Sequence, residues 1–371
     1  MKIIHLASSK RWTGVAEPMV NLAFYQKALG HEVWIGCERG RSLERRAGWL
    51  GQTVLKDMRL TARSNPFVVY QDIKSLRNYI NEIQPDVIHC HLLHDHWVSA
   101  FSLKKDTRKP LLVRTLHRYK RPYADPFHSW LYRKKTSLFI VPSGAMKKLV
   151  LEKHPSLKKR LHVVYGGINQ QRFHPQNNPD RARNICQVPK DAPFAGIVSR
   201  LRGDRNLDWF MEALPAVLKN LPDSRFVIAG RGEIAEELNS KIQEPPYKGR
   251  VVMPGYFTKS LSNLYAAMDV SIFLAQGSEG SCRAVMEAMA SGTPVIGLRE
   301  GVVPEIIEHG KSGWIVESRN VADLAKYLIR ALSDNEKTGV MGKAARKRME
   351  DKFNLLTMAE EVIRIYQSHL D

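Results

Sequence analysis

Short apolar runs alternate along the chain with longer stretches whose apolar residues recur at helical spacing. In the first half these runs contain mostly Val, Ile and Leu without strict alternation, which is typical of strands buried on both faces. They are residues 3–6, 33–36, 87–91, 111–117, 138–141 and 162–165. Helix-length segments, such as 15–29 and 73–83, separate most of them. This order predicts a doubly wound parallel sheet.

The pattern breaks at residues 174–180, which are rich in proline and asparagine, and then restarts. We therefore predict the interdomain linker at this segment. The later apolar runs are 195–199, 226–229, 251–253, 270–274, 294–297 and 314–316, again separated by helical patterns such as 207–218. A last amphipathic segment, 355–369, is followed by no strand. The second half is predicted to be another doubly wound domain.

A chain of 371 residues is too long for one compact core and fits two domains. We predict an N-terminal domain at 1–174, a C-terminal domain at 175–352 and a final helix at 353–371. Parallel sheets bind ligands at the carboxyl ends of their strands. The functional site is therefore expected in a cleft between the two domains.

The composition is that of a globular protein with neither a membrane span nor a disulfide framework. The longest apolar runs are far shorter than the ~20 residues of a spanning helix, and the N-terminal run is too short for a signal peptide. Cys37, Cys90, Cys186 and Cys282 are widely spaced and form no CxxC pair, which argues against a zinc site. We expect a soluble protein in a reducing, cytoplasmic compartment.

Charge divides the chain into unequal halves. Residues 1–180 hold 31 Lys and Arg against 13 Asp and Glu, whereas residues 181–371 hold 26 against 24. The first half therefore carries +18 of the net +20, and we expect it to meet an anionic partner. A membrane surface, an acidic or phosphorylated acceptor and nucleic acid all fit, and a merely solvated basic surface is the alternative. Basic clusters interleaved with aromatic residues such as Trp130 and Tyr132 can dock on anionic lipid headgroups or bind nucleic acid.

Two stretches of the second half carry candidate chemistry. After the strand at 271–274, a Gly/Ser loop precedes a helix predicted from Cys282 to residue 290, which offers free backbone N–H groups to an anion. Glu279 lies before this helix, and Glu287 lies inside it among apolar residues, where a carboxylate needs a hydrogen-bond partner. A helix-start acid and a surface charge are the plain alternatives. In the second stretch, Arg200 ends the first strand of the second domain and Arg205 precedes the helix that follows it. Cations at these places suit a diphosphate, unless they belong to a solvated loop.

The stretch 276–296, with seven residues between its two glutamates, resembles the signature of the retaining GT-B glycosyltransferases of family 4. Segments 303–307 and 310–316 are similar to that family as well. The resemblance is strong over the C-terminal half and loose over the N-terminal half. It implies the GT-B fold, with two doubly wound Rossmann-like domains, a deep interdomain cleft and a final helix that packs back on the first domain.

The same resemblance implies an enzyme that moves a sugar, with retention and without metal, from a nucleoside-diphosphate sugar to a glycan, lipid-linked or phosphorylated acceptor. The expected setting is synthesis of cell-envelope polysaccharide or lipopolysaccharide at the inner face of the membrane. The donor is a substrate, so no cofactor is expected, and neither is nucleic acid. The rival hypotheses are a GT-B sugar-nucleotide epimerase and a non-catalytic polyanion-binding protein.

The resemblance also assigns roles to individual residues. Glu287 would bind the ribose hydroxyls, Glu279 would face the donor sugar, and Tyr256 would meet the nucleobase. The backbone around the helix start would hold sugar hydroxyls and phosphate, through Gly280, Ser281, Cys282, Arg283 and Ala284. In this family Gly-Phe-Gly usually stands where this chain has Gly280-Ser281-Cys282.

Further assignments concern the phosphates and the first domain. Arg200 and Arg205 would neutralise the leaving phosphates, with Arg205 in place of the family's usual Lys. Gly14 remains from a Gly-Gly pair near the phosphates, and His117, in Thr115-Leu116-His117, would lie near the donor sugar and the acceptor. A buried structural role is the alternative for His117.

Two other kinds of chemistry are considered and not favoured. Cys282 resembles a nucleophile but has no evident base. His89, His91, His94 and His96 form a dense run that could bind a metal, but no complete ligand set accompanies it, and a cleft-lining loop is favoured. We therefore predict no metal site.

Overall fold

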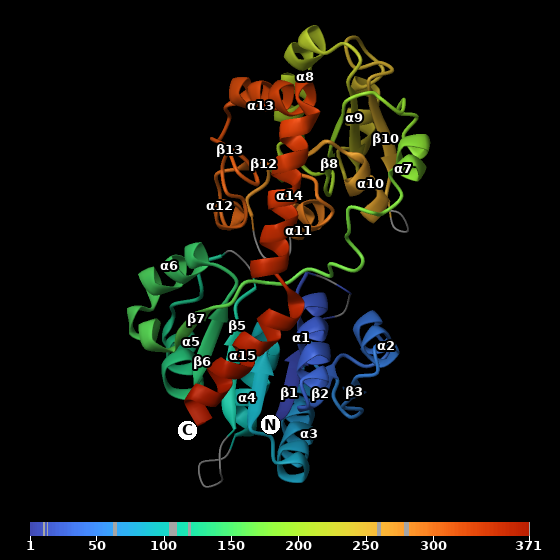
Figure 1. Cartoon of the computed structure of the whole chain (residues 1–371). Coiled ribbons are helices and arrows are strands. Elements are labelled where there is room, and N and C mark those ends of the chain that lie inside the picture. Colours follow the sequence, from blue (N-terminus) through green and yellow to red (C-terminus); the bar gives the residue numbers. More distant parts are fainter. Residues whose placement is uncertain are drawn as a thin grey trace. The chain divides into compact units, whose positions relative to one another are not determined.

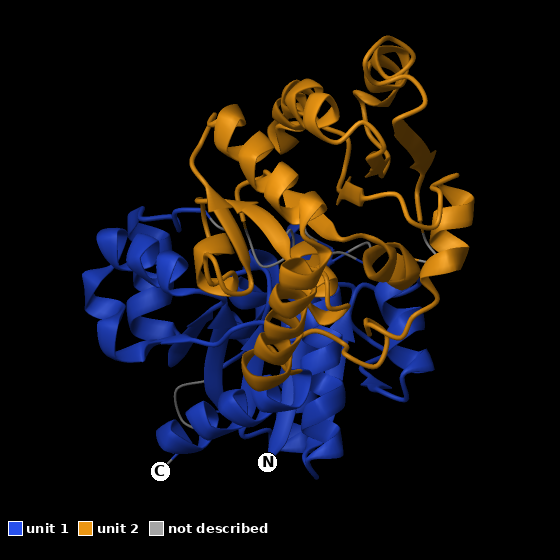
Figure 2. Ribbon diagram, turned by 45° about the horizontal axis from the view of Figure 1, so that its top comes forward, with its two compact units in different colours: residues 1–167, 278–280, 355–371 blue, residues 168–277, 281–354 orange. Residues whose placement is uncertain are grey.

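The computed structural model describes residues 1–9, 12, 14–61, 65–103, 110–117, 120–257, 261–277 and 282–370. These residues form two compact units, which Figure 2 shows in different colours. Unit 1 comprises residues 1–167 and the C-terminal segment from Leu355, and unit 2 comprises most of residues 168–354. Each unit has a parallel sheet and a hydrophobic core of its own.

Unit 1 is built on a seven-stranded sheet in the order β3-β2-β1-β4-β5-β6-β7, and all its strand pairs are parallel. Its strands are β1 (Lys2–Ala7), β2 (Glu32–Cys37), β3 (Thr53–Val54), β4 (Val87–Cys90), β5 (Leu111–Thr115), β6 (Leu138–Val141) and β7 (Leu161–Val163). Its helices are α1 (Ala16–Ala28), α2 (Ser42–Trp49), α3 (Pro66–Ile83), α4 (Leu93–Ser102), α5 (Pro126–Trp130), η1 (Leu131–Lys135), α6 (Gly144–Lys153), η2 (Pro155–Arg160) and α15 (Leu355–Leu370). Helices cover both faces of this sheet, as predicted (Figure 1).

The core of unit 1 lies in two layers, one on each face of its sheet. On one face α15 packs with α1, and its residues Met358, Val362 and Tyr366 join the core formed by β1 and β2. On the other face, residues of β4 and β5 pack with α4, η1 and α6. Because both faces are covered, the strands carry continuous apolar runs rather than an alternating pattern.

Unit 2 is built on a six-stranded parallel sheet in the order β10-β9-β8-β11-β12-β13. Its strands are β8 (Phe194–Val198), β9 (Arg225–Ala229), β10 (Val251–Gly255), β11 (Val270–Phe273), β12 (Val295–Leu298) and β13 (Gly313–Val316). Its helices are α7 (Pro179–Ile185), η3 (Gly203–Arg205), α8 (Leu207–Asn220), α9 (Ala235–Lys241), α10 (Leu261–Ala267), α11 (Arg283–Ala290), α12 (Val303–Ile306), α13 (Val321–Ser333) and α14 (Asn335–Lys352). The predicted face of α8 lies in the core, with Leu207, Phe210 and Leu214 buried.

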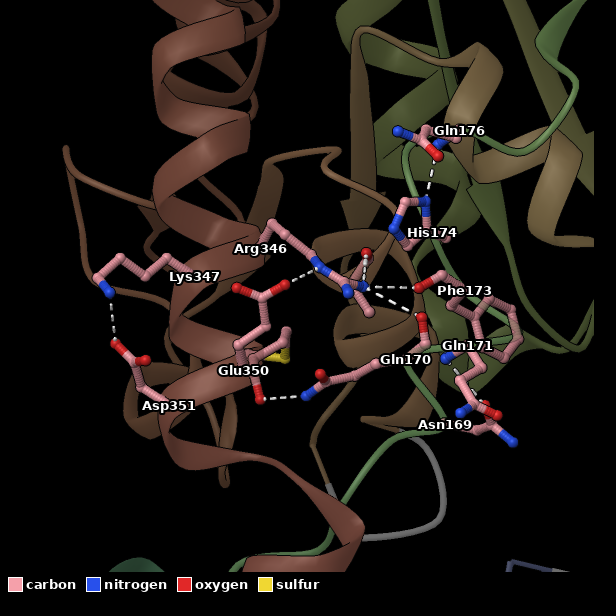
Figure 3. A network of polar contacts seen from close by, with 12 residues as sticks. Asn169, Gln170, Gln171, Phe173, His174, Gln176, Arg346, Lys347, Glu350 and Asp351 are labelled. Carbon is pink, nitrogen blue, oxygen red and sulfur yellow. Dashed lines mark hydrogen bonds and ion pairs between the residues drawn. The ribbon is translucent and has the colours of Figure 1, made fainter.

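Arg346 of α14 holds the first segment of unit 2 against the rest of that unit (Figure 3). Its Nη1 donates to the backbone oxygens of Phe173 at 2.8 Å and Ala290 at 2.7 Å, and more weakly to that of Gln170 at 3.4 Å. Its Nε donates to Glu350 at 2.6 Å. One guanidinium thus satisfies carbonyl groups from two distant segments, and it ties residues 170–173 to unit 2.

The boundaries of the units differ in detail from the predicted ones. The chain passes from unit 1 to unit 2 after Gly167, so residues 168–174 belong to unit 2, because the contacts of Arg346 hold them there. The segment 174–180 is also part of unit 2, and α7 begins at Pro179. The return to unit 1 follows Asn354, two residues after the predicted end of the second domain at 352. Helix α15 belongs to the core of unit 1.

Candidate functional site in the two units

Unit 2 carries a pocket of about 410 Å³ at the carboxyl ends of β8, β9 and β10. Arg200 follows β8, Arg231 follows β9 and Tyr256 follows β10, and all three line this pocket. The Arg231 guanidinium lies 5.3 Å from the centroid of the Tyr256 ring, which is 58% exposed. A solvent-facing aromatic ring beside two guanidiniums can stack on a flat base and attract a phosphate.

The loops that follow β8 and β9 pack closely against each other and shape this pocket. A Cβ atom on Gly230 would lie 1.8 Å from the backbone oxygen of Ser199, and one on Gly232 would lie 1.9 Å from that of Leu201. Only glycine therefore permits the loops after β8 and β9 to run side by side. The backbone N–H of Leu201 donates to the oxygen of Arg231 at 2.9 Å, which joins the two loops.

Arg205 lies in η3, and its side chain is mostly buried. Burial lowers the pKa of its guanidinium, Asp204 counteracts this, and Arg200 and Arg202 lower it further. Asp204 is 3.5 Å from Nε of Arg205, and no other ion pair of Arg205 is found among the described residues. The predicted Arg200 and Arg205 therefore influence each other electrostatically, and a polyanion nearby would stabilise both charges, although Arg205 is not among the residues that line the pocket.

Glu287 is 8% exposed in α11, and the buried carboxylate has the partner that the sequence required. Nη2 of Arg283, one turn earlier, donates to Oε1 of Glu287 at 3.2 Å. The carboxylate also adds to the effect of burial in raising the pKa of the buried Tyr265. The predicted Arg283 and Glu287 are therefore neighbours, and Ala284 lies between them in the first turns of α11.

Cys282 precedes α11 and is buried, with its Sγ directed at Gly277. Burial raises the pKa of this thiol, and Arg205 only partly counteracts the rise. A buried neutral thiol is a poor nucleophile, so the nucleophile hypothesis for Cys282 gains no support. Glu279, Gly280 and Ser281 lie outside the described residues.

Unit 1 carries a cavity of about 600 Å³ beside the carboxyl ends of β1, β4 and β5. His117 follows β5, is buried and lines this cavity. The predicted Gly14 lies in the turn before α1, next to Val15, which also lines the cavity. The two predicted residues of the first domain are therefore close to one cavity, although Gly14 itself is not part of its wall.

A chain of buried hydrogen bonds leads from His117 into the core of unit 1. Nε2 of His117 lies 2.9 Å from Nδ1 of His91, and Nε2 of His91 lies 3.1 Å from Nδ1 of His5. Nε2 of His5 in turn lies 2.7 Å from Oε1 of Gln26 in α1. Burial lowers the pKa of His5 to about 4 and that of His91 well below its usual value. His5 and His91 are therefore neutral at pH 7.

The histidine run is dispersed by the fold. His91 and His94 line the unit 1 cavity, whereas His96 is buried with Nε2 2.9 Å from Oγ1 of Thr136. His89 is buried beside His5 and His91, with imidazole nitrogens close enough to hold a metal ion. Each ring nitrogen of these three histidines already has a hydrogen-bond partner, since His89 contacts the hydroxyls of Thr115 and Tyr366 at 2.6 Å. A metal ion would have to displace those bonds.

Sequence reasoning missed two polar residues that shape the cavity of unit 1. Asp95 is fully buried in α4 and accepts four hydrogen bonds, from Ser8, His91 and Leu92. It thereby fixes the ends of β1 and β4. Arg114 is buried in β5 and lines the cavity. The sequence offered one indication of the role of Arg114, because a charged residue is unusual within an apolar run such as 111–117.

The remaining features bear on compartment and membrane contact. All four cysteines are free and buried. Within the part of the chain that the structure describes, no helix combines the length and the apolar character needed to cross a bilayer.

Comparison with known proteins gives matches along both units. Residues 12–172 match the family model "Glycosyltransferase Family 4", and residues 179–348 match "Glycosyl transferases group 1". Spore coat protein SA of Bacillus subtilis is 28% identical over 246 residues, which are 62% of this chain and 64% of that protein. Sulfoquinovosyl transferase SQD2 of Arabidopsis thaliana is 27% identical, over 78% of this chain and 59% of that protein. The chain thus spans about three fifths of the length of these two relatives.

A third relative, from Escherichia coli, is UDP-Gal:alpha-D-GlcNAc-diphosphoundecaprenol alpha-1,3-galactosyltransferase, which is 23% identical over 79% of this chain and 78% of its own length. Among solved structures, a glycosyltransferase from Rickettsia africae has a TM-score of 0.85 at 22% identity and covers 100% of this chain and 98% of its own. Anabaena Alr3699/HepE, in complex with UDP and glucose, has a TM-score of 0.79 at 19% identity, and the match covers 99% of this chain and 100% of that one. These likenesses show that the fold is GT-B.

Proposed function

This chain belongs to glycosyltransferase family 4, and from that premise we propose that it transfers a sugar from a nucleoside-diphosphate sugar to an acceptor. The observation that carries the proposal is the pocket of about 410 Å³ in unit 2, where Arg200, Arg231 and Tyr256 meet at the strand ends. Its volume is within the range of small-molecule sites. The UDP bound by Anabaena Alr3699/HepE, a protein of the same fold, supports a nucleotide donor.

In this proposal unit 2 binds the donor. Tyr256 stacks on the nucleobase, Glu287 accepts hydrogen bonds from the ribose hydroxyls, and Arg200 and Arg205 neutralise the diphosphate as the bond to the sugar breaks. The N–H groups at the start of α11, from Cys282, Arg283 and Ala284 together with Gly280 and Ser281, bind phosphate and sugar hydroxyls. Glu279 faces the donor sugar.

We propose further that the reaction retains the anomeric configuration and needs no metal, with the departing phosphate assisting attack on the same face. The guanidiniums of Arg200 and Arg205 supply the positive charge that a metal ion would otherwise bring. His117 and Gly14 act from unit 1, where His117 contacts the acceptor in the cavity of about 600 Å³. Analysis of the anomeric configuration of the product by NMR tests retention.

The proposed acceptor is a glycan, a lipid-linked sugar or a phosphorylated molecule of the cell envelope. The diphosphoundecaprenol-linked substrate named for the Escherichia coli relative supports this class. The +18 charge of residues 1–180 supports an anionic acceptor and contact with an anionic membrane surface from the cytoplasmic side.

Exposed aromatic residues in unit 1 support membrane contact. The rings of Trp97, Phe101 and Trp130 form one cluster with centroids 5.6–6.4 Å apart, and Nζ of Lys135 lies 5.3 Å from the Trp130 ring. Phe127, in the same helix as Trp130, is 75% exposed. Sedimentation with anionic vesicles, compared with zwitterionic ones, tests this surface, and Phe127→Ser should weaken binding if it inserts.

Binding of the donor is tested by a thermal-shift screen with UDP-, GDP-, ADP- and CDP-linked sugars. A donor at about 100 times its Kd should stabilise the fold by about 2.7 kcal/mol. Glu287→Gln should weaken this response about tenfold or more, since it removes a charged acceptor. Glu317→Gln is the matched control, because Glu317 is an exposed carboxylate of unit 2 that pairs with Arg299.

The proposal fails if none of these nucleotide sugars stabilises the protein. It also fails if incubation with donor alone yields an isomerised sugar nucleotide, because an epimerase needs no acceptor.

A further inference from the structure

Arg114 holds a buried guanidinium whose hydrogen-bonding capacity is largely unused. The residue lies in β5 with 7% of its surface exposed. Among the described residues neither Nε nor Nη1 has a hydrogen-bond partner. The same side chain lines the unit 1 cavity of about 600 Å³. Two buried donors therefore belong to a residue on the wall of an open space.

The protein does not compensate this charge by direct pairing. Burial lowers the pKa of Arg114, and Asp95 acts in the opposite direction. The Asp95 carboxylate, however, already accepts hydrogen bonds from Ser8, His91 and Leu92. A buried charge without a hydrogen-bonded partner is strongly unfavourable, so an external anion would satisfy it.

Other residues of the cavity wall favour a phosphate group over a single carboxylate. Lys120 and Arg121 also line the cavity, and both are exposed to solvent. Nη2 of Arg121 lies 3.6 Å from the Glu152 carboxylate, and Nζ of Lys120 lies 5.9 Å from the centroid of the Tyr123 ring. Three cations around one cavity suit a group that carries up to two negative charges.

Aromatic residues complete the wall and indicate what the phosphate is attached to. Trp97, Tyr123 and Tyr132 line the same cavity, together with apolar residues such as Leu116 and Met146. Such faces pack against the ring of a sugar or an apolar chain. An inorganic ion alone would leave them uncovered.

We infer that the unit 1 cavity is a binding site for a phosphate ester, with the guanidinium of Arg114 donating to phosphate oxygens and the aromatic wall packing on the organic part. Only the identification of this ester with the acceptor rests on the proposed transferase function. Arg114 is thereby assigned as the residue that selects a phosphorylated acceptor.

The test measures binding of three probes by isothermal calorimetry and thermal shift at constant ionic strength. The probes are inorganic phosphate, glucose 1-phosphate and dispersed short-chain phosphatidic acid, and sodium chloride is the reference. We expect glucose 1-phosphate or phosphatidic acid to bind more tightly than inorganic phosphate, and the tighter of the two identifies the source of the ester. Arg114→Met should weaken that binding about tenfold or more, since it removes charged hydrogen bonds.

The unliganded stability of the variant separates a binding role from a structural one. Removing a buried charge that has no partner should leave Arg114→Met at least as stable as the wild type. The matched control is Arg160→Met, because Nη1 of Arg160 donates to the backbone oxygen of Thr136 at 2.6 Å. This control should lose stability and keep the response to the probes. Arg114→Gln is the second variant if Arg114→Met does not fold.

Three results would overturn the inference. In the first, the wild-type protein binds no probe better than chloride. In the second, the Arg114 variant binds the probes as tightly as the wild type does. In the third, the Arg114 variant keeps its binding of the probes and loses its response to the nucleotide sugar. The donor screen is a separate experiment. A wild-type protein that binds the phosphate ester but no nucleotide sugar would refute the transferase and leave this site in place.

Discussion

Nδ1 of His91 lies 2.9 Å from Nε2 of His117, so two buried imidazoles share one hydrogen bond beside the cavity of unit 1. The direction of this bond follows from the other end of the chain. A carbonyl oxygen only accepts, so Oε1 of Gln26 requires a proton on Nε2 of His5. The neutral His5 then accepts from His91, which in turn accepts from His117.

We therefore predict that the neutral His5 and His91 carry their proton on Nε2, and that Nε2 of His117 is the donor to His91. Nitrogen-15 NMR of histidine-labelled protein at pH 7 distinguishes the two tautomers. Gln26→Leu removes the terminal acceptor and should produce a mixture, whereas Gln26→Glu should keep the Nε2–H form. Detection of the Nδ1–H form of His5 or His91 in the wild type would refute the assigned direction.

Acid should destabilise unit 1, because this unit buries histidines in their neutral form. Burial lowers the pKa of His5, His89, His91 and His96 below 6.5, so the unfolded chain binds more protons than the folded one below that pH. The free energy of unfolding is then fully retained above about pH 6.5 and falls as pH decreases towards 4. Each histidine contributes up to about 1.4 kcal/mol per pH unit in this window.

Urea unfolding between pH 7 and pH 5 measures this slope, and His96→Gln should reduce it by the share of one histidine. Asp72 acts in the opposite sense at lower pH, because burial raises its pKa. A free energy of unfolding that does not change between pH 7 and pH 5 would contradict the neutral state of these histidines.

Removal of divalent metal should leave transfer unchanged. Neutralisation of the leaving phosphates is assigned to Arg200 and Arg205 of unit 2, and the charge of Arg200 helps to lower the pKa of Arg205. The rate of sugar transfer, measured after dialysis against EDTA, should therefore equal the untreated rate, and Arg205→Met should lower it about a hundredfold. Loss of activity with EDTA, restored by Mg²⁺ or Mn²⁺, would show that the two guanidiniums are not sufficient.

The contacts of Arg346 should matter more to unit 2 than those of its neighbour Lys347 (Figure 3). Arg346→Met leaves the carbonyls of Phe173 and Ala290 without their donor and should cost about 1.5–3 kcal/mol of unfolding free energy. Lys347 pairs with Asp351 at 3.4 Å on the surface, so Lys347→Met should cost less than about 0.5 kcal/mol. Chemical denaturation of both variants makes the comparison, and equal losses would mean that Arg346 is not structurally important.

Much of the fold could be predicted from the sequence, because buried parallel strands leave an unmistakable apolar pattern. Strand β6 has the predicted bounds 138–141. Strand β9 begins at Arg225, one residue before the predicted 226–229. Helix α3 begins at Pro66, before the predicted 73, because Asn65 caps it by accepting from the backbone N–H of Val68 at 3.0 Å. That cap is a local polar signal which apolar periodicity does not contain.

The site was predictable where one short segment carries it and not where the fold assembles it. Glu287 and its need for a partner follow from the local sequence, and Arg283 is only one turn away. His5 and Gln26, by contrast, meet His91 only because β1, α1 and β4 are adjacent in the sheet and its covering layer. No spacing in the sequence encodes that adjacency.

The place of α15 in the core of unit 1 has a consequence for synthesis on the ribosome. Tyr366 packs against the earliest strands, and its hydroxyl lies 2.6 Å from Nδ1 of His89. The first unit to emerge therefore cannot complete its core until residues beyond the entire second unit have been translated. During that interval the apolar residues of α1 and the sheet that α15 will cover stay open to solvent.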